Sequence, residues 1–250
     1  MENQSPIIEQ ILASISADAP VRSILVGAHW TVVCSRGCGM ASTITGDKPH
    51  GEARVRQAGQ LHTQSARQLA ELARSDTPLE ASIGVAAINS LLEVDLSQAV
   101  ELNAASVLCE RGAGKKVALV GHFPFIQKLR EAASTLWVIE QQPSQGEHPP
   151  EDAVDLLPQA EVVALTASAF INQTMEFLLG LCNRDALVMV LGPSTPLTTV
   201  WFERGVEILS GSVVIDENAA IRTIGQGATF QQVQGVKRVT LQKAPSLPAF

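Results

Sequence analysis

The residues of this 250-residue chain that could do chemistry follow short apolar runs. Glu140 ends one run, Thr166 ends another, and Ser194 follows a third after Gly192 and Pro193. A carboxylate at the end of a strand can accept hydrogen bonds from the hydroxyl groups of a ribose, and a hydroxyl at a helix start can bind an anion. An exposed carboxylate and a structural turn are the alternative explanations. The pattern therefore indicates a binding site and leaves its ligand open.

The loop Gly121–Pro124 also follows an apolar run, Val117–Val120. It lacks the complete G-x-G-x-x-G pattern, so it supports a dinucleotide only weakly. His122 is the one histidine that the pattern places at a strand end, where an imidazole can act as a metal ligand or a base. Glu140 stands about 20 residues after Gly121, close to the position of the ribose-binding acid in Rossmann domains. An enzyme that uses a nucleotide-like cofactor is therefore an alternative interpretation of these residues.

Cysteine spacing gives little support for a zinc site. Cys34 and Cys38 form a C-x3-C pair, whereas zinc sites commonly use C-x2-C or C-x4-C, and only His29 stands near enough in sequence to join them. The start of the chain has no basic segment followed by an apolar one, so it predicts no signal peptide. We therefore expect all four cysteines to be reduced thiols, with Cys109 and Cys182 on apolar helix faces.

The first part of the chain mixes helical and strand patterns. A helical period covers residues 7–15, and β-rich runs at 21–26 and 30–34 predict a hairpin, with a third strand over 40–44. Helical patterns return at 65–73 and 78–92. These elements predict a small α+β domain over residues 1–95.

From residue 96 onward, strand and helix patterns alternate. Apolar runs without alternation predict strands that are covered on both faces, and they are joined by helical segments, which is typical of a parallel sheet. The predicted strands cover residues 117–120, 136–139, 162–165, 187–191, 206–209 and 236–241, and the predicted helices cover 101–111, 123–133 and 170–181. We expect an α/β, Rossmann-like domain over 96–243 and a disordered tail over 244–250. The loops after parallel strands share one edge of the sheet, so the candidate residues should gather there.

Composition excludes several function classes. The chain has 18 basic and 25 acidic residues, a net charge of −7, and it shows no basic run that would grip a phosphate backbone. Its apolar stretches fall short of the ~20 residues that span a bilayer. We therefore expect a cytoplasmic protein that binds neither nucleic acid nor a membrane.

Several stretches, taken in order, resemble the putative heavy-metal chelation family. They are Val117–Pro124, Leu136–Glu140, Leu156–Val163, Thr166 with Ile171–Thr174, Gly192–Leu197, Gly205–Gly211 and, in the first part, Ala86–Asn89. The resemblance covers most of the chain. It implies an enolase-N-terminal-like domain before the Rossmann-like domain, with a site in the cleft between them.

The resemblance also implies which residues line that cleft. Asn89 would face it from the first domain, and the second domain would contribute Gly121, Phe123, Pro124, Glu140, Thr166, Asn172, Thr174, Gly192, Pro193 and Ser194. His122 stands where the family more often has an aromatic residue, and we include it as a candidate ligand. The resemblance implies a metal, and the oxygen and nitrogen donors of Glu140, His122 and Asn89 suit a borderline divalent transition metal as cofactor.

Three functions follow as hypotheses. The leading hypothesis is heavy-metal chelation, or binding of a metallophore or another small ligand, in the interdomain cleft. The alternative is a transferase or lyase that uses a nucleotide-like cofactor such as S-adenosylmethionine, with Glu140 on the ribose. The third is an interaction module whose cleft is filled by apolar side chains.

Overall fold

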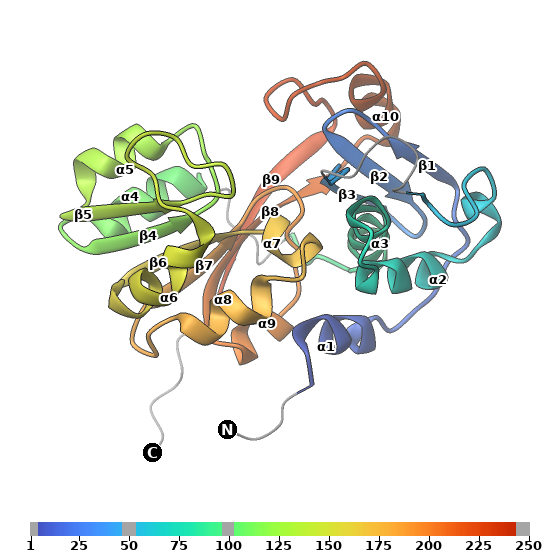
Figure 1. The fold of residues 1–250 in the computed structure, drawn as a ribbon. Helices are drawn as coiled ribbons and strands as arrows, with labels where there is room; N and C mark the ends of the chain where they lie inside the picture. The colour runs from blue at the N-terminus through green and yellow to red at the C-terminus, as the bar shows by residue number, and fades with distance from the viewer. Residues whose placement is uncertain (1–4, 47–53, 97–102, 244–250) are drawn as a thin grey trace.

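The computed structural model describes residues 5–46, 54–96 and 103–243 and contains two sheets (Figure 1). The expected disordered tail, 244–250, lies outside the described residues. The helices and strands of the first part are α1 (Ile7–Ser14), β1 (Ser23–Val26), β2 (Trp30–Cys34), β3 (Cys38–Ser42), α2 (Ala66–Ala70) and α3 (Pro78–Leu91). Those of the second part are α4 (Ala104–Gly112), β4 (Lys116–Val120), α5 (Ile126–Ala132), β5 (Thr135–Ile139), α6 (Ala153–Leu156), β6 (Val162–Thr166), α7 (Ser168–Ile171), α8 (Met175–Leu181), β7 (Leu187–Leu191), α9 (Val200–Glu203), β8 (Val206–Val214), α10 (Glu217–Gly225) and β9 (Val236–Gln242).

The first part is a three-stranded antiparallel sheet in the order β1-β2-β3, with α3 packed against it. Pro78 stands in the first turn of α3, where its missing N–H costs nothing. A methyl group on Gly39 of β3 would lie 2.1 Å from the carbonyl oxygen of Ala86. Only a glycine lets the strand and the helix approach so closely. This contact places the C-terminal end of α3 against β3.

The second part is a six-stranded sheet in the order β5-β4-β6-β7-β8-β9, in which only β9 is antiparallel to its neighbour. Its five parallel strands confirm the α/β, Rossmann-like expectation. The C-terminal ends of β4 to β7 therefore share one edge, as the loop pattern predicted. No helix among the described residues is both long enough and apolar enough to cross a membrane.

Two segments of the second part differ from expectation. The helix expected over 170–181 is two helices, α7 and α8, separated by a turn in which Gln173 has a φ of +59°. The strand expected over 206–209 continues to Val214, because β9 pairs with it from Ile208 onward. The extended end of β8 reaches β3, so the two sheets meet there (Figure 1).

One hydrophobic core joins the two parts. Ile83 and Ile88 of α3 belong to the same buried cluster as Phe170 of α7 and Trp201 of α9. The Trp201 indole is fully buried and donates to the Pro196 carbonyl oxygen over 2.8 Å. The space between the two sheets is thus packed rather than open, and any site between them has to be small.

Candidate functional site

Asn89, near the C-terminal end of α3, joins the two parts of the chain. Its Nδ2 donates to the carbonyl oxygen of Met40 on β3 over 3.0 Å and to that of Ser194 over 3.2 Å. Two carbonyl acceptors fix the orientation of the amide, since only the nitrogen can donate to them. The Asn89 Oδ1 atom is buried and has no hydrogen-bond partner among the described residues.

Ser194 lies in the loop after β7 and is fully buried. Its Oγ accepts from the Ser42 backbone N–H over 2.8 Å and lies 3.1 Å from the Ser42 hydroxyl. The neighbouring Thr195 hydroxyl is within 2.8 Å of the Gly192 carbonyl oxygen and 3.0 Å of the Ser210 carbonyl oxygen. These hydroxyls therefore hold the loop and the two sheets together. The next helix, α9, begins at Val200.

A small pocket of about 110 Å³ lies where the two sheets meet. Its wall comes from the turn before β3, the end of α3, the loop after β7 and the extended end of β8. The lining residues are Gly37, Cys38, Asn89, Leu92, Val94, Leu96, Thr195, Leu197, Ser212, Val213 and Val214. Of the predicted site residues, Asn89 alone belongs to this lining. The wall is mostly apolar, and its polar side chains are those of Cys38, Asn89, Thr195 and Ser212.

The predicted residues at the ends of β4 and β6 do come together. A methyl group on Gly121, whose φ is +104°, would lie 2.8 Å from Thr166 Cβ and 3.2 Å from the Phe123 ring. Glu140 directly follows β5, the neighbour of β4 in the sheet, and its Oε1 accepts from the Gln141 N–H. These residues form a second group farther along the same sheet edge, and Pro124 lies in the loop after β4.

His122 belongs to this second group and is exposed. Its Nδ1 lies 3.2 Å from Glu147 Oε1, and the Glu147 side chain is only 8% exposed. The other Glu147 oxygen accepts from the Ser144 N–H over 2.9 Å. The Glu147 carboxylate thus positions the imidazole, although Glu147 was not among the predicted site residues.

Asn172 and Thr174 lie in the turn between α7 and α8. The Thr174 hydroxyl lies 3.4 Å from the Ala169 carbonyl oxygen, and the adjacent Gln173 donates to the Ser75 carbonyl oxygen over 2.8 Å. Within the described ranges, no hydrogen bond joins Asn172 or Thr174 to the other predicted site residues. The structure therefore divides the predicted set between the sheet edge, this turn and the interdomain contact at Asn89.

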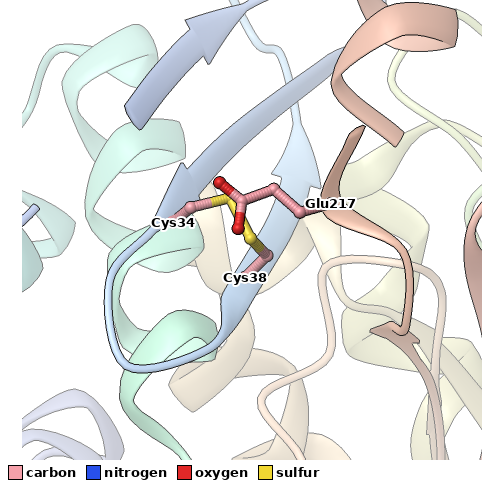
Figure 2. A group of neighbouring side chains, drawn as sticks. All are labelled: Cys34, Cys38 and Glu217. Atoms are coloured by element: carbon pink, nitrogen blue, oxygen red, sulfur yellow. A yellow bond between two sulfur atoms is a disulfide. The ribbon is translucent and has the colours of Figure 1, made fainter. Parts of the chain in front are cut away.

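The expectation of four reduced thiols is wrong for Cys34 and Cys38, which form a disulfide. The two residues are register partners across the β2–β3 turn, so their side chains leave the hairpin on the same face. His29 does not join them. Glu217, at the start of α10, does, because its carboxylate lies within 4.8 Å of both sulfur atoms (Figure 2).

Arg22 completes the surroundings of this group. Its Nη1 lies 2.5 Å from Glu217 Oε2, its Nη2 lies 4.0 Å from Cys38 Sγ, and its Nε donates to the Ser35 carbonyl oxygen. Neither Arg22 nor Glu217 was a sequence candidate. The one available signal was Asp216, a residue type that commonly caps a helix, and its carboxylate does accept from the Ala219 N–H.

Cys109 and Cys182 are free and half-buried rather than fully in the core, and Cys182 directly follows α8. Burial raises the pKa of the Cys182 thiol to about 12. A thiol with so high a pKa holds almost no thiolate at neutral pH, so it is a poor nucleophile and a poor metal ligand.

Comparisons with known proteins agree on one family. Residues 8–92 match one family model and residues 103–243 match another, and both models are described as putative heavy-metal chelation. An uncharacterized protein of Methanocaldococcus jannaschii is 25% identical over 172 residues, a match that spans 66% of this chain and 66% of the relative, just under two thirds of its length.

Two solved structures have the same fold. A DUF364-family protein of unknown function from Desulfitobacterium hafniense superposes with a TM-score of 0.83 at 28% identity, covering 95% of this chain and 98% of that one. Another protein of that family, from Pyrococcus horikoshii, gives a TM-score of 0.81 at 18% identity, covering 96% and 99%.

Proposed function

The chain belongs to the putative heavy-metal chelation family, and from that premise we propose that it binds a small metal chelate in the pocket between its two sheets. The family description names chelation but no metal and no residue. The proposal therefore rests on what the pocket wall can offer to a ligand.

The observation that carries the proposal is the unpartnered Oδ1 atom of Asn89. A buried acceptor without a donor costs roughly 1 to 3 kcal/mol, and proteins usually satisfy such atoms. The Asn89 amide cannot turn to find a partner, because its nitrogen is held by Met40 and Ser194. Because Asn89 lines the pocket, we propose that a ligand bound there donates an N–H or O–H group to this oxygen.

The lining also explains why we propose a chelate rather than a bare cation. Among the described lining residues there is no carboxylate and no imidazole, and the polar side chains besides Asn89 are Cys38, Thr195 and Ser212. Cys38 is held in a disulfide and the Ser212 hydroxyl donates to the Pro193 carbonyl oxygen. A divalent ion needs several oxygen or nitrogen ligands, so it would have to arrive with its own.

We also propose that the other predicted site residues contribute to ligand binding. Gly121, His122, Phe123, Pro124, Glu140 and Thr166 follow the same edge of the sheet toward β5, and His122 and Glu140 offer nitrogen and oxygen donors there. A larger chelate could extend along that edge. The nucleotide-cofactor alternative depends on the same Glu140 and also stays a prediction.

Native mass spectrometry tests the proposal even though the chelate is unidentified. The full chain, purified gently from cells supplied with Zn²⁺, Ni²⁺ and Co²⁺, should carry an adduct that contains one metal ion and an organic molecule. Asn89→Ala should lower its occupancy about tenfold, the effect of losing one buried hydrogen bond. Asn218→Ala, on the exposed face of α10, is the matched control and should keep the adduct.

A second variant covers the risk that Asn89→Ala loosens the fold, because Asn89 also bonds to Met40 and Ser194. Val213→Phe fills the pocket from β8 and changes no partner of these hydrogen bonds, so it should also remove the adduct. Wild-type protein without an adduct, or an adduct that survives both pocket variants, would refute the proposal.

A further inference from the structure

We infer that Cys34, Cys38 and Glu217 form a redox-gated metal site, which shares only Cys38 with the lining of the Asn89 pocket. In the disulfide state the group excludes metal, and in the dithiol state it binds one Zn²⁺ or Cd²⁺ ion. The inference does not depend on the ligand of the Asn89 pocket, because Asn89 is not among the three residues and the free ion is the species bound.

The positions of the three side chains come from two parts of the fold. The β2–β3 register places Cys34 opposite Cys38, and the N-terminal end of α10 brings in Glu217 from the second part of the chain. Figure 2 shows the Glu217 carboxylate beside the sulfur pair. Two thiolates and one carboxylate form a ligand set that zinc-like ions accept, with a further position left for water or another ligand.

The charges around the group favour a divalent cation. After reduction, two thiolates and the Glu217 carboxylate would face the single guanidinium of Arg22, which leaves an excess of two negative charges. One divalent ion neutralises that excess. Arg22 also lies near Cys38 Sγ, and a neighbouring guanidinium stabilises a thiolate. Because Arg22 also pairs with Glu217, the ion would share the Glu217 carboxylate with Arg22.

Accessibility differs between the two sulfurs. Cys34 is fully buried and belongs to a cluster with Val32, Met40 and Ile224, whereas Cys38 is half-buried and lines the pocket. Thiol–disulfide exchange requires the attacking thiolate to reach a sulfur atom. We therefore assign the first step of reduction to Cys38.

An external dithiol reduces the Cys34–Cys38 bond in two exchange steps. One thiolate of the reductant attacks Cys38 Sγ, the Cys34–Cys38 bond breaks, and Cys34 leaves as a thiolate. The second thiol of the reductant then displaces Cys38 and closes the reductant into its own disulfide. The protein gains two electrons and two protons, and binding of the divalent ion releases the two thiol protons to the solvent.

The β2–β3 hairpin should keep its conformation and its packing after reduction. β2 pairs with β1 on one side and β3 on the other, and Arg22 N–H donates to the Cys34 carbonyl oxygen over 2.7 Å. Gly37 N–H also donates to the Ser90 carbonyl oxygen, which ties the turn to α3. None of these interactions requires the disulfide.

The experiment compares two redox states of the same full-length protein. One sample is reduced with a phosphine, which takes up the oxygen of one water molecule, and the reductant is then removed without air; the other sample stays oxidised. Zn²⁺ is titrated into both by calorimetry in the presence of a pH indicator. Reduced protein should bind one ion and release about two protons, and oxidised protein should bind at least about 100-fold more weakly.

Variants identify the ligands. Cys34→Ser with Cys38→Ser should abolish the thiolate-to-metal charge-transfer absorption that Co²⁺ gives with reduced protein, and Cys109→Ser, which removes a different thiol, should keep it. Glu217→Gln should weaken Zn²⁺ binding about tenfold or more, whereas Glu203→Gln, at an exposed position of α9, should not. Melting curves show whether each variant is folded.

The Asn89→Ala variant distinguishes the failure of this inference from the failure of the pocket proposal. Asn89→Ala should leave Zn²⁺ binding by the reduced protein unchanged even where it removes the chelate. Equal Zn²⁺ affinity in the two redox states, cobalt absorption that survives loss of both cysteines, or a Glu217→Gln variant with wild-type affinity would overturn the inference.

Discussion

Glu80 shows how a single buried charge is stabilised in this fold. Among the described residues it is the one charged residue that is buried when backbone and side chain are counted together, with 2% of its surface exposed. It accepts from the Arg56 backbone N–H over 2.7 Å, from the Arg56 guanidinium over 2.9 Å and from the Ser75 hydroxyl over 2.6 Å. Burial alone would raise the pKa of Glu80, but these hydrogen bonds outweigh it, and the pKa lies below the ordinary value of 4.5.

The lowered pKa predicts how stability depends on pH. The Glu80 contribution is present above the unfolded pKa, near 4.5, and is lost as the pH falls through the lower folded value. We expect Glu80→Gln to lower the free energy of unfolding at neutral pH by roughly 1 to 3 kcal/mol, and the difference should shrink in acid. Urea unfolding across pH measures this, with exposed Glu203→Gln as control. A difference that is independent of pH would contradict the assignment.

At the scale of elements, α3 is the helix on which the site depends. β3 contacts it through Gly39, and the segment Glu71–Arg74 contacts it through Gly84. A methyl group on Gly84 would lie 2.0 Å from the backbone nitrogen of Ala73. Because backbone atoms cannot yield as a side chain can, α3 would have to shift, and Asn89 would shift with it.

A pair of helical glycines tests this packing. Gly84→Ala in α3 should destabilise the protein by about 2 kcal/mol or more, the cost of overpacking against backbone. Gly180→Ala in α8 meets no atom within 4 Å, and it should stabilise by up to about 1 kcal/mol through helix propensity. Chemical denaturation gives both values. Equal effects of the two substitutions would show that the close approach at Gly84 does not constrain α3.

Local patterns predicted most elements but not those that depend on tertiary pairing. The apolar runs located β4 to β7 closely, since buried parallel strands have a distinct composition. Residues Ser210, Gly211 and Ser212 resemble a strand exit, yet β9 pairs along them and extends β8. Pairing with a distant strand overrides weak local β propensity. The same extension brings α10 and Glu217 to the cysteines.

The site was predictable to a similar, limited extent. Strand order places Gly121 beside Thr166, and the loop pattern anticipated that. Asn89 came from the family resemblance, because an asparagine at the end of an apolar helix carries no signal of its own. The Cys34–Cys38 bond follows from hairpin register, which a C-x3-C spacing does not reveal without the turn.

At the scale of the whole molecule, the two sheets share one core and leave a small, mostly apolar pocket in it. Ser42, Ser194 and Asn89 bond across the contact, and apolar side chains of α3, α7 and α9 fill most of the remaining space. An interaction module would need no unsatisfied acceptor in such a contact. The orphaned Asn89 oxygen therefore favours a ligand.

The most direct test of the pocket proposal is anomalous diffraction from crystals of protein purified without added ligand. We expect an anomalous peak from a transition metal in the pocket bounded by Asn89, Leu197 and Val213, with organic density that donates to Asn89 Oδ1. Crystals of Asn89→Ala should lose both. A wild-type pocket that holds only water, or a metal bound directly by protein side chains elsewhere while the pocket is free of organic density, would contradict the account.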